Sequence, residues 1–144
     1  MSTSTDAILC YGVEFEEGHE FPWDDAEGEF EGFEEWWALQ CGVSGPKVPY
    51  SPESKEEYNK YWDIKREKME ECPVELVLHC SGEYPMYIIA AKGSVTTAYR
   101  GTPVTVSPLG FDKTSEYHTA VAEFVDKYEI FGPRPDWLLC SYWG

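Results

Sequence analysis

The chain has 144 residues, which fits one domain and allows a sizeable core without a metal or a disulfide. Its 27 acidic residues against 11 basic ones give a formal net charge of −16 at pH 7. Such a chain repels phosphate backbones and anionic lipid headgroups. The composition therefore argues against direct binding to nucleic acid and against binding to a membrane surface.

The sequence carries no signal of export. The first six residues hold neither a base nor an apolar run, and no stretch approaches the roughly 18 apolar residues of a membrane span. The five cysteines are widely spaced and form no C-x-x-C pair, which favours reduced thiols. We therefore expect a cytoplasmic protein.

Three elements are predicted in the first half of the chain. Residues 7–13 (AILCYGV) form a continuous apolar run typical of a buried strand, and residues 14–29, rich in acids and containing Gly and Pro, are predicted as a loop. A short helix follows at 30–40, where aromatic residues recur at i, i+3 and i+7. A longer helix should begin at Ser51 and Pro52 and end before Pro73.

The second half is rich in strands. Strands are predicted at 74–80, 85–91, 94–100 and 136–143, with a short edge strand at 103–107 bounded by prolines. Between them, apolar residues from Tyr117 to Tyr128 hold the spacing of an amphipathic helix. The order β-α-α-β-β-β-α-β predicts a single α+β domain over residues 1–144, with one mostly antiparallel sheet and its helices packed on one face.

Negative charge is concentrated near the start. Residues 1–46 hold 12 acids and no Lys or Arg, and the acids between Glu14 and Glu35 are interleaved with aromatic residues. In one interpretation the rings anchor this segment on the core while the acids face water. In the other, exposed rings join the carboxylates in a contact surface, as aromatic anchors do in strong interfaces.

No pattern identifies a catalytic or metal site. The loop after Asp24 lacks the EF-hand spacing, the histidines lie outside any short zinc-ligand pattern, and no G-x-S-x-G, phosphate loop or H-E-x-x-H motif occurs. We expect no catalytic residues, no metal and no cofactor.

Several segments are distinctive: ILCYG, EGHEFPWD, EEWW, PVELVLHC, YPMYIIA and the C-terminal WLLCSYWG. Together they resemble a group of small acidic phage and prophage proteins with no assigned function. The resemblance extends over nearly the full length. It implies a phage origin and a location in the host-cell cytoplasm, and it implies no activity.

Our first hypothesis is a non-enzymatic binding protein. It would antagonise a basic host protein, such as a defence or nucleic-acid-binding protein, by docking carboxylates on its surface. Dense like charge costs stability, so its presence suggests a cationic target. The expected docking residues are Glu14, Glu16, Glu17, Glu20, Asp24, Asp25, Glu27, Glu29 and Glu31, with Trp23 as an aromatic anchor.

Two alternatives remain open. A small-molecule binder or small enzyme would have a pocket lined by Tyr87, Tyr99 and Trp62, which suits a cationic or nucleobase-like ligand. A structural role in the virion is the third hypothesis.

Overall fold

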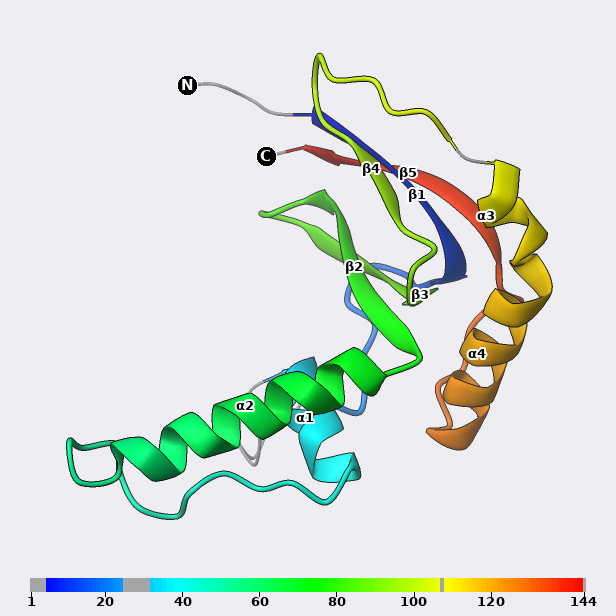
Figure 1. Cartoon of the computed structure of the whole chain (residues 1–144). Helices are drawn as coiled ribbons and strands as arrows, with labels where there is room; N and C mark the ends of the chain where they lie inside the picture. The colour runs from blue at the N-terminus through cyan, green and yellow to red at the C-terminus, as the bar shows by residue number, and fades with distance from the viewer. Residues whose placement is uncertain (1–4, 25–31, 107, 144) are drawn as a thin grey trace. The chain divides into compact units, whose positions relative to one another are not determined.

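The computed structural model describes residues 5–24, 32–106 and 108–143 (Figure 1). It divides into two compact units: the sheet unit, residues 1–20 with 73–144, and the helical unit, residues 21–72. The sequence predicts one domain, because neither junction carries the Gly-, Ser- or Pro-rich stretch typical of a linker. The helical unit occupies the connection between the first two strands.

The sheet unit contains one five-stranded sheet. Its strands are β1 (Thr5–Glu14), β2 (Val74–Ser81), β3 (Pro85–Ala91), β4 (Thr96–Ala98) and β5 (Asp136–Trp143). Their order is β3-β2-β5-β1-β4, and only the pairing of β2 with β5 is parallel. The predicted α+β fold with a mostly antiparallel sheet is confirmed.

An additional pairing closes part of this sheet. The first half of β1 pairs with β4, whereas its end, Gly12 to Glu14, pairs with β3. Strands β1, β3, β2 and β5 therefore form a ring of pairings. Gly12 permits this approach, because a Cβ at this position would collide with the carbonyl oxygen of Ile89. Gly12 thus serves as a point of close backbone approach.

The core of the ring is small and apolar. Its buried members are Ile8, Cys10, Val77, Ile88 and Ala90. Partly buried residues of β5 complete it, and they alternate along the strand as expected for one face: Leu138, Cys140 and Tyr142.

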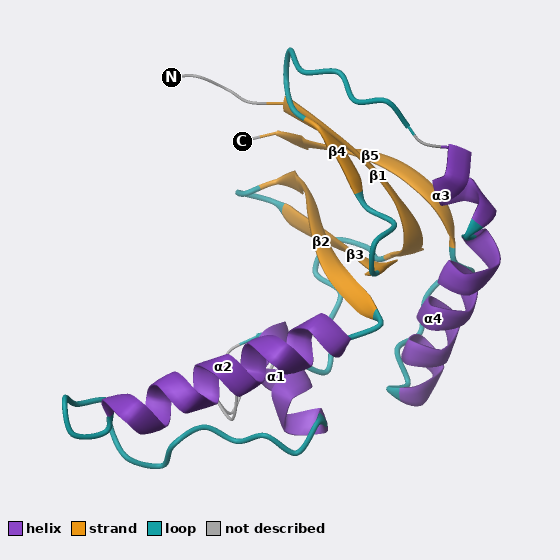
Figure 2. Cartoon of the chain, viewed as in Figure 1, coloured by secondary structure: helices purple, strands orange, loops and turns teal. Residues whose placement is uncertain are grey.

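Two helices accompany the sheet. The helix α4 (Thr114–Lys127) lies beside the sheet (Figure 2). It packs against β1 and β3 and buries Val121 and Phe124. The short helix α3 (Pro108–Asp112) precedes it and is not predicted from the sequence. The predicted edge strand at 103–107 is wrong for its described residues 103–106, which form a loop. Proline at 103 removes a backbone donor that a strand would need.

The helical unit contains α1 (Phe33–Gln40) and α2 (Lys55–Glu71). The indole Nε1 of Trp37 donates a hydrogen bond of 2.8 Å to the carbonyl of Lys68 and ties α1 to the last turns of α2. The helix α2 begins at Lys55 rather than at Pro52, because a preceding turn forms. In this turn the hydroxyl of the buried Ser54 donates to the carbonyl of Pro49 at 3.0 Å.

Candidate binding sites

The predicted docking residues begin on an ordered stretch of the sheet unit. Glu14, Glu16, Glu17 and Glu20 are exposed, while Phe15 is only 5% exposed. The ring of Phe15 packs against the His19 imidazole, with centroids 4.6 Å apart, and the backbone N–H of His19 donates to the carbonyl of Glu16 at 3.1 Å. A buried ring and a turn thus hold these carboxylates outward.

The same alternation continues in the helical unit. Phe21 and Trp23 are buried and stack at 4.8 Å with nearly parallel planes, and Trp23 also contacts Phe33 and Trp36. Asp24 is exposed, and its Oδ2 accepts a hydrogen bond of 2.8 Å from the backbone N–H of Phe21. At 4% exposure, Trp23 belongs to the interior and is not the exposed anchor expected from the sequence.

The remaining predicted carboxylates, Asp25, Glu27, Glu29 and Glu31, lie outside the described residues. In the described part of the chain, no basic side chain forms an ion pair with Glu16, Glu17 or Glu20. Their charge is therefore not neutralised there, and it is available to a partner.

The three rings of the expected pocket do not share one of the cavities found. Trp62 lines a hollow of about 300 Å³ in the helical unit, together with Lys65 and Arg66. Tyr99 lines a hollow of about 460 Å³ at the start of β1 in the sheet unit. Tyr87 lies on β3 opposite Leu78. The sequence alone does not show whether these three rings meet, and in the structure they lie on separate elements.

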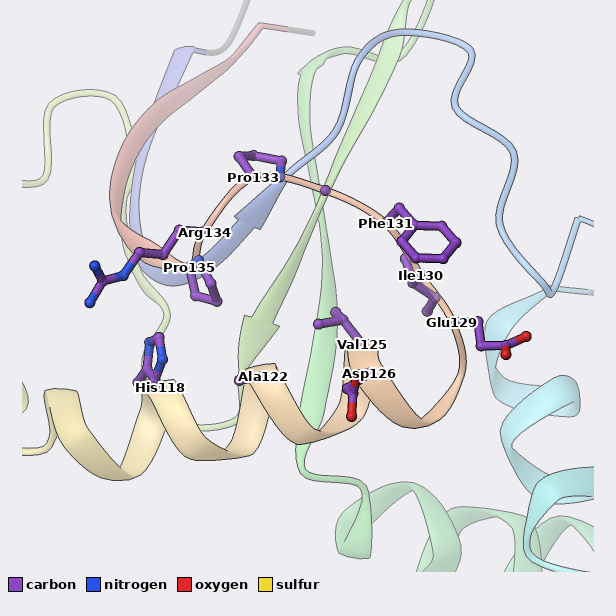
Figure 3. A pocket seen from close by; sticks show the side chains of 11 residues that line it. His118, Ala122, Val125, Asp126, Glu129, Ile130, Phe131, Pro133, Arg134 and Pro135 are labelled. Atoms are coloured by element: carbon purple, nitrogen blue, oxygen red, sulfur yellow. The ribbon is translucent and has the colours of Figure 1, made fainter.

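A larger cavity, called the α4 cavity below, lies in the sheet unit between α4 and residues 129–135 (Figure 3). Its volume is about 640 Å³, and it is lined by both charged and apolar side chains. Figure 3 places His118 and Arg134 at one end and Glu129 and Phe131 at the other. The sequence gives no sign of this cavity, because the apolar spacing of α4 is that of any helix packed on a sheet.

The side chain of His118 is held in place by Tyr11 of β1. The Tyr11 hydroxyl lies 2.8 Å from Nδ1 of His118 and donates to the carbonyl of Pro135 at 3.2 Å. Burial raises the pKa of Tyr11, and the negative charge of Asp136 adds to this effect. The phenol therefore remains protonated near neutral pH and acts as a hydrogen-bonding group rather than as an anion.

Several titratable side chains of the sheet unit are partly or wholly buried. None of the five cysteines, all of which lie in the described residues, forms a disulfide, and burial raises the pKa of the Cys10 thiol to about 12, with Cys140 and Glu75 adding to the rise. Burial also raises the pKa of Glu75 and lowers that of His79. No group of three or more metal-ligating side chains occurs among the described residues. These groups thus favour their neutral forms, which suits a structural interior.

Comparison with known proteins gives no relative. No protein-family model matches the chain, and no curated protein sequence or solved structure is significantly similar to it. Within the part of the chain that the structure describes, no helix combines the length and the apolar character needed to cross a bilayer.

Proposed function

We propose that this protein is a binding protein that docks its acidic segment, residues 14–35, on a basic surface of a partner protein. The observation that supports this most is the alternation of buried rings with exposed carboxylates. Phe15, Phe21 and Trp23 are buried, while the described acids of the segment are exposed: Glu14, Glu16, Glu17, Glu20 and Asp24. Rings that anchor the backbone limit the ordering entropy that the segment loses on binding.

The chemistry of the surface defines the partner. Carboxylates without neighbouring bases attract lysine and arginine side chains and increase the rate of association. Proteins that bind nucleic acid present such basic surfaces for phosphates, and carboxylates carry the same sign of charge as phosphates. The resemblance to small phage proteins favours a basic host protein, in particular a defence or nucleic-acid-binding protein, met in the host cytoplasm and antagonised by this contact.

The experiment is capture of a partner from a bacterial host lysate by four-fold variants of matched charge. The test variant replaces Glu16, Glu17, Glu20 and Asp24 by Lys. The control replaces four exposed acids of the helical unit and its α2, which changes the net charge by the same amount: Glu53, Glu56, Glu67 and Glu70. Both variants are checked for folding by circular dichroism.

The proposal predicts that the wild type and the control capture the same basic protein and that the test variant does not. Because all eight positions are exposed, both variants should fold, with the test variant somewhat less stable because it loses the hydrogen bond between Asp24 and the backbone N–H of Phe21. Equal loss in both variants would attribute binding to overall charge, and equal capture by all three proteins would exclude the acidic segment as the docking surface.

A further inference from the structure

The α4 cavity has the dimensions of a small-molecule site. Its volume of about 640 Å³ lies within the range of about 300–1,000 Å³ that is typical of ligand pockets. It is formed within the sheet unit and does not include the predicted docking carboxylates. Ligand binding in this cavity therefore does not depend on the proposed docking function.

The middle of the cavity is apolar. Ala122 and Val125 lie four and seven positions after His118 and so share its face of α4, and the buried Ile130 faces them from the loop. Ala122 is the smallest side chain of this face and leaves the space open. Phe131, 83% exposed, stands at the far end, where its ring is available to cover a ligand. The body of a ligand would therefore be apolar.

The near end offers a cation beside the imidazole of His118. Arg134 contributes a guanidinium group, whose donors match a carboxylate in two parallel hydrogen bonds. The Tyr11 hydroxyl lies 2.8 Å from Nδ1 of His118, so this nitrogen is engaged by the sheet. The other ring nitrogen, Nε2, has no hydrogen-bond partner among the described residues and is left for a ligand.

The surrounding charge disfavours a multiply charged anion. Asp126 and Glu129 line the same cavity and repel a dianion such as a phosphate monoester. We propose that the α4 cavity binds a small organic monocarboxylate, with its carboxylate on Arg134 beside His118 and its apolar body on Ala122, Val125 and Ile130.

The test is an NMR titration with phenylacetate, using phenylacetamide as the neutral probe of the same shape. The readout is the imidazole C–H signal of His118, which His118→Gln identifies among the three histidines. The wild type should give a saturable shift with phenylacetate below about 20 mM and at least a fivefold weaker response to phenylacetamide.

Two variants and a control locate the site. Arg134→Gln should weaken phenylacetate binding about tenfold, and Ala122→Leu should abolish it by filling the cavity. Arg66→Gln removes the same charge from α2 and should change nothing. Equal affinity for the two probes, no saturable shift, or unchanged affinity in Arg134→Gln would overturn the proposal. Because Arg134 is exposed, this variant remains informative if Ala122→Leu does not fold.

Discussion

Tyr11 of β1 and His118 of α4, 107 positions apart in the sequence, are joined by a hydrogen bond of 2.8 Å. The same phenol also reaches the loop before β5 through Pro135, and its ring packs edge-on against Trp137 at 5.5 Å. One side chain thus connects the first strand, the last strand and the main helix of the sheet unit. It also determines which nitrogen of His118 remains available at the α4 cavity.

Tyr11→Phe tests this connection. The variant keeps the ring contacts and removes both hydrogen bonds, so the free energy of unfolding should fall by about 1–2 kcal/mol in urea denaturation. Without the hydroxyl, the tautomer preference of His118 should also weaken, which the imidazole ¹⁵N shifts report. An unchanged tautomer in a folded variant would contradict the claim that the Tyr11 hydroxyl selects the tautomer of His118.

Gly132 determines how closely the cavity loop approaches the sheet. A Cβ at this position would lie 2.8 Å from Cγ1 of Val13 and 3.0 Å from the ring of Phe15. Gly132→Ala should therefore displace the loop and lower the free energy of unfolding by about 1–3 kcal/mol. At Gly110 a Cβ meets nothing within 4 Å, so Gly110→Ala is the control and should cause no such loss. Equal stability of the two variants would show that the loop can move aside without lowering the free energy of unfolding.

The cysteines should differ in reactivity. Because the thiolate is the reactive form, a Cys10 thiol that is buried and has its pKa raised to about 12 should resist iodoacetamide in the native protein. Cys80 is exposed and should be alkylated first. Peptide mass spectrometry over a time course measures both rates, and denatured protein provides the control. Native rates that are equal for the two residues would show that the ring of strands opens readily.

Glu75 should make the stability depend on pH. Burial raises its pKa above the ordinary value of 4.5, against the opposing attraction of Lys92. A raised native pKa contributes stability below pH 4.5 that is lost as the pH rises through the native value. Glu75→Gln removes the buried charge and should therefore increase the melting temperature at pH 7. Each kcal/mol gained in the free energy of unfolding corresponds to roughly 2–4 °C.

The control for that prediction is Glu116→Gln, which changes an exposed carboxyl of α4. At pH 4 the advantage of Glu75→Gln over the wild type should shrink, since Glu75 is then largely protonated in both states. An advantage that is the same at both pH values would attribute the effect to packing or to hydrogen bonding with the amide rather than to the buried charge.

Local patterns explain most of the secondary structure. The apolar runs at 74–80, 85–91 and 136–143 predict β2, β3 and β5 to within one residue. The strand expected at 94–100 is shortened to Thr96–Ala98, because Ser94 adopts another role. Its hydroxyl accepts from the backbone N–H of Tyr11 at 3.1 Å and donates to the carbonyl of Ala91 at 2.7 Å. Such a side-chain contact depends on tertiary structure and leaves no periodic signal.

The binding sites could be predicted from the sequence less completely than the secondary structure. Charge density predicts the acidic segment, but burial of Trp23 depends on Phe33 and Trp36, which the chain supplies from α1. The α4 cavity depends on the Tyr11–His118 contact and on the close fit of Gly132, both of which join distant segments. Neither relationship has a characteristic spacing, so the His118 end of the cavity could not be predicted.

The dependence of partner affinity on salt tests the central claim most directly. The dissociation constant of the captured partner is measured by titration calorimetry at about 50 and about 500 mM salt, where charges that remain accessible to solvent are screened to very different extents. Docking through the exposed carboxylates predicts a weakening of at least tenfold for the wild type, a similar weakening for the control with Glu53, Glu56, Glu67 and Glu70 replaced, and no measurable binding of the Glu16, Glu17, Glu20 and Asp24 variant at either salt concentration. Equal wild-type affinity at the two salt concentrations would contradict the account.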